Sequence, residues 1–288
     1  MLLTRPPMPA LRPFVEAVWA SDPTPAASPA TAQAAPTAPP ASLERVLPTG
    51  SMHLAIRLTG PPLQVLGTDR GAREFLGHAV VGGVRDRCYV RDISAPVRSV
   101  GAQLRPSAVL PLFDATAADL AGRHTPLEQL WGRSAVTARE RLLDAGSLER
   151  QLLVFEHLLL ERLPRVCGVH PAVAHALAQL SATPARSLAV RDVVRESGYS
   201  HRRFIELFRR SVGLTPKRYQ RLSRFRAALA AVDLDAPPTW ADLALAAGYS
   251  DQAHFSREFR AFSGVTPGAY LAARPAARHH VPILDVSG

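Results

Sequence analysis

The chain has 288 residues, of which 47% are hydrophobic and 20% charged, and its formal net charge is +10. These values are typical of a globular protein with enough residues for about two domains. No apolar run approaches the length of a membrane span, which excludes a membrane-spanning chain. The only two cysteines, Cys88 and Cys167, do not indicate a disulfide framework. Prolines at positions 6 and 7 interrupt the apolar core that a signal peptide needs, so we expect a cytoplasmic protein.

The first 135 residues have the pattern of a β-rich domain. Short alternating segments predict strands near 14–21, 44–50, 52–58, 63–66, 79–81, 88–93 and 97–104. Turns of Gly, Pro and Asp at close intervals favour a sandwich or barrel over a parallel sheet. Residues 106–113 predict a short helix that starts at Pro106. The Ala, Pro, Thr and Ser of 22–42 predict a disordered insertion, with a proline-rich docking segment as the alternative.

Residues 136–168 predict a helical connector between two domains. Its strongest helix, over 148–163, has one apolar stripe of Leu152, Phe155, Leu159 and Leu163. A second apolar surface consists of Leu153, Val154, Leu158 and Leu160. A helix that is apolar on two sides must be covered on both. Two interpretations stay open: packing against the β-rich domain alone, or an additional contact with a second copy in a homodimer.

One pattern occurs twice in the C-terminal part, about fifty residues apart. The first copy consists of Gly198-Tyr199-Ser200, Phe204, Phe208 and Gly213-Leu214-Thr215-Pro216. The second copy consists of Gly248-Tyr249-Ser250, Phe255, Phe259 and Gly264-Val265-Thr266-Pro267. In each copy a short helical segment stops at the first glycine and another follows, which is the layout of a helix-turn-helix. A helix over 216–232 would join the two copies.

The second helix of each copy separates an apolar face from a polar one. The phenylalanines at helical spacing predict the buried face. The outward faces carry Arg202, Ile205, Glu206 and Arg209 in the first copy, and Gln252, Ala253, Ser256, Arg257 and Arg260 in the second. Such side chains suit the base edges of a DNA major groove. Residues 184–275 also hold about fifteen basic against eight acidic residues, as phosphate binding requires. An all-helical bundle without DNA is the alternative.

At these residues the sequence resembles the AraC/XylS family of bacterial transcription regulators, over about the last hundred residues. The resemblance implies an all-α DNA-binding domain over 169–275 with two helix-turn-helix units, and double-stranded DNA as partner. Carried over by position, the family's base-reading sites are Arg202, Ile205, Glu206, Gln252, Ala253, His254 and Arg257. The structural positions of the motif are Gly198, Phe204, Phe208, Pro216, Gly248, Phe255, Phe259 and Pro267. Since many contacts go to phosphates, we assign these to Arg203, Arg209, Arg210, Lys217 and Arg260.

The N-terminal half also resembles part of such regulators, namely a small cupin-like β-barrel sensor domain. The similar segments are 47–50 (Leu-Pro-Thr-Gly), 103–106 (Gln-Leu-Arg-Pro) and 126–132 (Pro-Leu-Glu-Gln-Leu-Trp-Gly). This resemblance implies that the domain binds a small-molecule effector or pairs two subunits. It also implies RNA polymerase as a partner if the protein is an activator. The expected fold is therefore α+β, with a barrel-like domain followed by the helical one.

Signals for an enzyme are weak, and we predict no catalytic residue, metal or cofactor. His53, His78 and His124 are scattered without a His-x-His pair, and Cys88 is expected to be a small buried residue in a strand. No Gly-rich phosphate loop or Gly-x-Ser-x-Gly elbow occurs. The alternative function is an enzyme or metal-binding cupin-like protein that its helical domain localises to DNA. The tail over 276–288 is expected to be loose.

Overall fold

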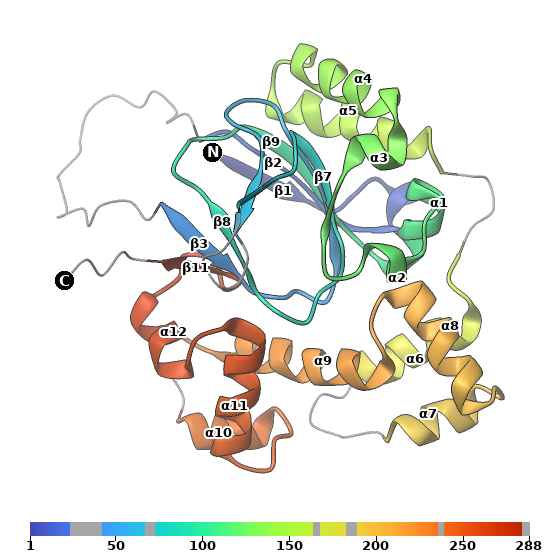
Figure 1. The fold of residues 1–288 in the computed structure, drawn as a ribbon, viewed down its shortest axis with the longest axis vertical. Helices are drawn as coiled ribbons and strands as arrows, with labels where there is room; N and C mark the ends of the chain where they lie inside the picture. The colour runs from blue at the N-terminus through green and yellow to red at the C-terminus, as the bar shows by residue number, and fades with distance from the viewer. Residues whose placement is uncertain (24–41, 67–72, 164–167, 183–188, 236–238, 284–288) are drawn as a thin grey trace.

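The computed structural model describes residues 1–23, 42–66, 73–163, 168–182, 189–235 and 239–283. It has a β-rich N-terminal part and a helical C-terminal part, which confirms the expected α+β fold (Figure 1). Most of the predicted insertion over 22–42 lies outside the described residues. No helix in the described ranges is long and apolar enough to cross a membrane.

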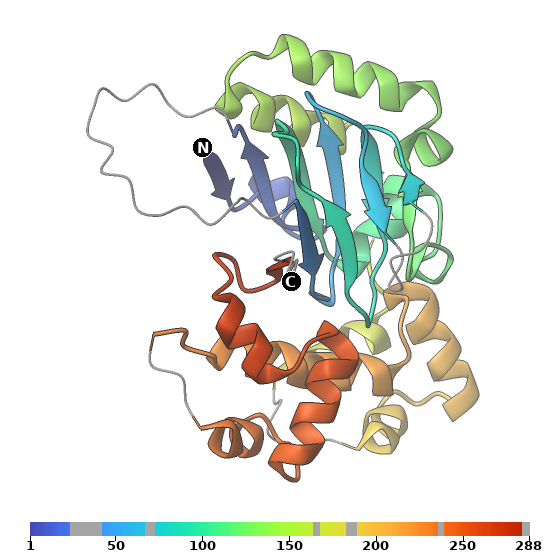
Figure 2. The ribbon, with the colours of Figure 1, turned by 60° about the vertical axis from the view of Figure 1, so that its left-hand side comes forward.

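The strands form two antiparallel sheets that face each other (Figure 2). The first has the order β1 (Leu2–Arg5), β2 (Val15–Ser21), β9 (Ser99–Leu104), β4 (Met52–Arg57), β7 (Ala79–Gly82) and β10 (His124–Pro126). The second has the order β11 (His280–Ile283), β3 (Leu43–Val46), β8 (Tyr89–Asp92), β5 (Gln64–Leu66) and β6 (Arg73–Phe75). Within the described residues no strand joins the two sheets into a closed barrel, so the sandwich is the better description.

The two faces of the first sheet follow the alternation of its strands. On β4, Leu54 and Ile56 are fully buried, whereas His53 and Arg57 lie on the face toward the second sheet. Helix α5 (Leu148–Leu160) covers the apolar face together with α4 (Arg133–Asp144) (Figure 1). Of the predicted stripe, Leu152, Phe155 and Leu159 are buried there, whereas Leu163 is half-buried and lies beyond the end of α5 at Leu160. Leu153 on the other side of the helix is 49% exposed. The homodimer contact through that side therefore stays a prediction.

The N-terminal part also contains short helices. They are the 3-10 turns Pro9–Leu11 and Pro106–Ala108 and the helices α1 (Val109–Phe113), α2 (Ala117–Leu120) and α3 (Leu127–Trp131). The expected helix over 106–113 is thus present, and it begins as a 3-10 turn because proline occupies the first position without an N–H to satisfy.

Seven helices make up the described C-terminal part. They are α6 (Pro171–Ala182), α7 (Val190–Glu196), α8 (His201–Val212), α9 (Pro216–Ala231), α10 (Trp240–Ala246), α11 (Gln252–Ser263) and α12 (Pro267–Ala273). The repeated Gly-x-Thr-Pro segment ends one helix and starts the next. Gly213 and Gly264 adopt left-handed conformations as C-caps, and the hydroxyls of Thr215 and Thr266 cap the following helices.

The C-terminal tail differs from its prediction. We expected 276–288 to be loose, but His280–Ile283 form β11, which pairs antiparallel with β3 of the N-terminal part. The pair is reinforced by His280, whose Nδ1 lies 2.8 Å from Glu44 Oε1, and by the Leu47 amide, which donates to the His279 carbonyl over 2.8 Å. A four-residue strand without a neighbouring partner in sequence carries too little local signal to be recognised.

Candidate nucleic-acid interface

The first helix-turn-helix unit consists of α7, a turn at Gly198 and α8. Gly198 has a φ of +72°, a conformation that favours glycine, so α7 ends where the sequence predicts. The N-cap hydroxyl of Ser200 accepts from the Arg203 amide and starts α8. Phe204 and Phe208 are fully buried with ring centroids 6.0 Å apart. The predicted division of this helix into an apolar and a polar face is therefore confirmed.

The opposite face of α8 is open to solvent. Arg202, Arg203, Glu206 and Arg209 are exposed, and Ile205 is half-buried. The Arg203 guanidinium lies 3.3 Å from a Glu206 carboxylate oxygen, so these two side chains restrain each other in the unbound protein. An exposed ion pair of this kind contributes little to stability and can be exchanged for contacts to a ligand.

The second unit consists of α10, a turn at Gly248 and α11. Phe259 is fully buried among aromatic rings, with centroids 5.4 Å from Phe225, 5.6 Å from Phe255 and 5.7 Å from Tyr270. Edge-to-face pairs at these distances stabilise a core beyond their buried area. The two copies of the repeat therefore build the same kind of unit, each around its phenylalanine pair.

Like α8, helix α11 has one face that is open to solvent. Gln252, Ala253, Arg257 and Arg260 are exposed. His254 is half-buried and held in place, because its amide donates to Asp251 over 2.7 Å and its Nδ1 lies 3.1 Å from Ser250 Oγ. Of the expected base-reading residues in this unit, His254 is thus the least free to reach outward.

Helix α9 holds both units. One unit lies at each end of this helix, with α7 and α8 at one end and α10 and α11 at the other (Figure 1). Glu258 of α11 is almost fully buried and pairs with Arg221 and Arg224 of α9. The Arg224 guanidinium also lies 5.3 Å from the Tyr249 ring centroid. This cluster could not be predicted from the sequence, because the three elements that it joins are separated along the chain.

Comparisons with known proteins agree with this geometry. Residues 193–273 match a family described as a helix-turn-helix domain, and residues 3–126 match a domain of unknown function. An AraC-like transcription regulator of Streptomyces lividans is 32% identical over 136 residues, which are 41% of this chain. The chain is similar to AraC-like transcription regulators over part of its length. It spans less than half, 44%, of the length of that curated relative.

Solved structures are also similar to this chain. ToxT from Vibrio cholerae is 9% identical, with a TM-score of 0.46 over 81% of this chain and 94% of ToxT. A regulator from Chromobacterium violaceum with an AraC-type DNA-binding domain is 26% identical, with a TM-score of 0.33 over 37% of this chain and 94% of its own.

Helices α8 and α11 both end beside the N-terminal part, at the loop 83–88 between β7 and β8. A Cβ at Gly213, just after α8, would lie 2.4 Å from Val84 Cγ1. Asp86 forms an ion pair of 3.3 Å with Arg218 at the start of α9. The Cys88 amide donates to the carbonyl of Phe262 in α11 over 2.9 Å. One loop therefore contacts both helix-turn-helix units. Cys88 is half-buried and precedes β8, which corrects its expected place inside a strand.

The tight contact at Gly213 leads to a test with a matched control. Gly213 and Gly198 both have positive φ, +85° and +72°. Replacing either with alanine should cost about 1 kcal/mol of backbone strain. Only at position 213 would the new methyl group meet another part of the chain, so Gly213→Ala should cost roughly 1 to 3 kcal/mol more. Equal unfolding free energies in urea for the two variants would disprove the contact.

The structure brings together two histidines that the sequence analysis described as scattered. His53 and His124 lie between the sheets with ring centroids 5.6 Å apart, and Tyr89 lies 4.6 Å from His124. Arg85 Nη2 is 3.3 Å from His124 Nδ1, which accepts because a guanidinium only donates. His124 Nε2 has no hydrogen-bond partner among the described residues. Nowhere in the described ranges do three or more His, Cys, Asp or Glu form a group that could hold a metal.

Burial sets the protonation of this cluster. Burial, and next the charge of Arg85, lowers the pKa of His53 to about 3 and that of His124 to about 2. Burial also raises the pKa of Tyr89. Near neutral pH the cluster thus presents neutral imidazoles and a phenol beside the charged Arg85. Because Arg85 belongs to the loop 83–88, the cluster lies beside the residues of that loop that contact both helix-turn-helix units.

Proposed function

We propose that the chain is a sequence-specific DNA-binding transcription regulator, a role its AraC-type units serve. The observation that carries this proposal is the pair of exposed polar helix faces, on α8 and α11, at opposite ends of one rigid helix. Helix α9 has 16 residues and a length of about 24 Å at 1.5 Å per residue. Two recognition helices carried at its ends suit successive major grooves of one duplex.

Base reading is assigned to side chains near the start of each recognition helix. These are Arg202, Ile205 and Glu206 of α8, and Gln252, Ala253, His254 and Arg257 of α11. Phosphate contacts are assigned to Arg203, Arg209, Arg210, Lys217 and Arg260, all of which are exposed. Arg210 is the weakest of these, because it also lies close enough to Asp119 of α2 to act on that carboxylate's charge.

The single variant Arg257→Ala tests the assignment of base reading. We expect it to weaken binding to cognate DNA by about 1 to 3 kcal/mol and to change binding to unrelated DNA much less. The measurement is a pair of titrations at fixed salt, since phosphate contacts make affinity fall with salt. Arg150→Ala, an exposed position on α5, is the control. Equal losses on the two DNAs would instead assign Arg257 to a phosphate.

The N-terminal part is proposed to respond to a small-molecule effector and to adjust DNA binding through the loop 83–88. A homodimer and, for an activator, RNA polymerase are the further partners that we propose, together with a cytoplasmic location. We propose no catalytic activity. Metal analysis of the purified protein combined with a gel shift on its own upstream DNA tests the rival function: bound metal without a shifted band would favour an enzyme.

A further inference from the structure

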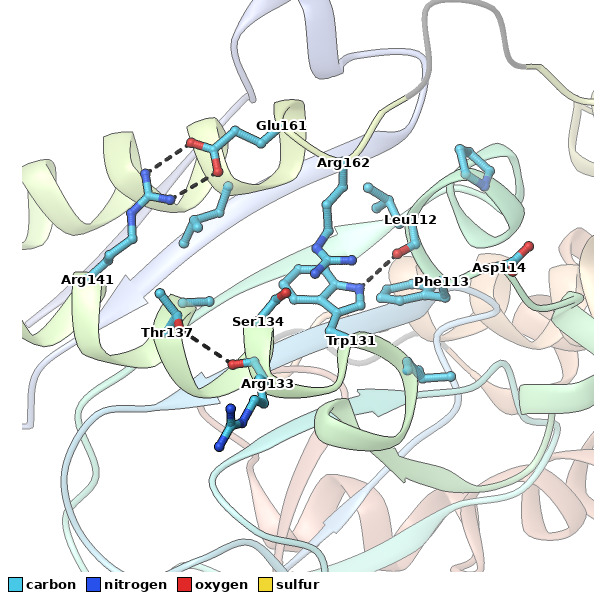
Figure 3. A pocket seen from close by; sticks show the side chains of 14 residues that line it. Leu112, Phe113, Asp114, Trp131, Arg133, Ser134, Thr137, Arg141, Glu161 and Arg162 are labelled. Atoms are coloured by element: carbon cyan, nitrogen blue, oxygen red, sulfur yellow. Dashed lines mark hydrogen bonds and ion pairs between the residues drawn. The ribbon is translucent and has the colours of Figure 1, made fainter.

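A pocket on the outside of the N-terminal part belongs neither to the DNA-binding faces nor to the cluster between the sheets. It lies among α1, α3, α4 and α5 and has a volume of about 670 Å³ (Figure 3). Its apolar lining consists of Pro111, Leu112, Phe113, Leu130, Trp131, Ala138 and Leu158. The pocket is large enough for a small organic molecule with an apolar body.

Trp131 provides a fixed aromatic surface in this pocket. Its indole N–H donates to the Leu112 carbonyl over 2.8 Å, and Phe113 stacks beside it at 6.1 Å between ring centroids. The Arg162 guanidinium lies 4.1 Å from the Trp131 ring centroid, so the aromatic face holds it at the pocket (Figure 3). The positive group is thereby positioned before any ligand arrives.

The charge of Arg162 is not neutralised. Glu161, the adjacent carboxylate, is engaged by Arg141 through two hydrogen bonds of 3.0 Å. None of the described carboxylates forms an ion pair with Arg162, and burial lowers the pKa of its guanidinium. Arg133 at the rim adds a second positive charge, against the exposed Asp114. A partly desolvated guanidinium beside apolar surface is suited to bind a carboxylate.

We propose that this pocket binds an amphipathic organic acid, with its carboxylate on Arg162 and its apolar or aromatic body against Trp131, Leu130 and Leu158. The hydroxyls of Ser134 and Thr137 line the same pocket and can hold further polar groups of the ligand. Arg162 is the second residue after α5, at the start of the segment that leads to the C-terminal helices. A ligand here would act where one domain passes into the next. That regulatory role rests on the proposed function, whereas binding itself does not.

Binding is tested on the full chain without DNA. The indole N–H signals of Trp19, Trp131 and Trp240 are followed by NMR during titration with phenylacetate and indole-3-acetate, with Trp131→Phe to assign the signal. We expect the acids to shift the Trp131 signal saturably and the other two little. Phenylacetamide, which lacks the charge, should bind at least about tenfold more weakly.

Two variants test whether the carboxylate of the bound acid contacts Arg162. Arg162→Met should weaken binding of both acids at least about tenfold, whereas Arg150→Met, an exposed control on α5, should not. A Trp131 signal that does not respond to either acid, or responds equally to the amide, would overturn the proposal, and neither comparison depends on a variant that folds. Equal binding by Arg162→Met would overturn it as well. Because no DNA is present, a negative result leaves the DNA-binding proposal untouched.

Discussion

Replacing Phe259 with alanine is expected to lower the free energy of unfolding by about 3 to 5 kcal/mol, the largest effect of any single change considered for this chain. Phe259 is fully buried between α9, α11 and α12, and three aromatic rings surround it. Its removal would leave a cavity that rigid neighbouring rings cannot fill by a small shift. Specific DNA binding should be lost together with the fold of the second unit.

The matched control for this variant is Leu245→Ala on α10 of the same unit. Leu245 is 64% exposed, so its truncation should change stability by no more than about 0.5 kcal/mol. Urea unfolding followed by circular dichroism measures both variants. A loss at Phe259 no larger than that at Leu245 would mean that the phenylalanines do not form the core of the unit.

Acid is expected to destabilise the protein well above the pH at which carboxylates protonate. An unfolded histidine takes up a proton below a pH of about 6.5, whereas the pKa values of His53 and His124 are about 3 and about 2 in the folded chain. Stability is therefore complete above the unfolded pKa and is lost as pH falls below it. Between about pH 7.5 and 5.5 the two groups together should remove roughly 2 to 3 kcal/mol.

His279 should add to this loss, because burial lowers its pKa to about 4. Glu44 acts at lower pH: the hydrogen bond from His280 and the charge of Arg91 hold its pKa below the ordinary value despite burial, so its contribution is lost only as its carboxylate protonates. The double variant His53→Gln/His124→Gln should flatten the dependence above pH 5.5. An unchanged slope in this variant would show that the two imidazoles are not held neutral.

The helix-turn-helix units could be predicted because their signals are local. The spacing of Phe204 and Phe208, the left-handed glycines and the Thr-Pro helix starts all lie within a few residues of the elements they determine. The strands of the N-terminal part were predicted for the same reason, wherever apolar and polar residues alternate over four or more positions, as in β4.

The contacts between distant segments could not be predicted in this way. The pairing of β11 with β3 joins residues more than 230 positions apart, and no property of His280–Ile283 alone identifies its partner. The same holds for Glu258 with Arg224, for His53 with His124 and for the loop 83–88. The sequence indicates which residue types are available, but only the topology determines which of them meet.

A missing-contact experiment tests most directly whether α8 and α11 read two successive major grooves. It uses DNA that the full chain has selected from a random pool. Binding is measured for the parent, for Glu206→Ala in α8 and for Arg257→Ala in α11. We expect the bound chain to protect two successive major grooves on one side of the duplex, about one helical turn apart. Each variant should lose base contacts in a different groove. Protection of a single groove, or loss in the same groove for both variants, would contradict this expectation.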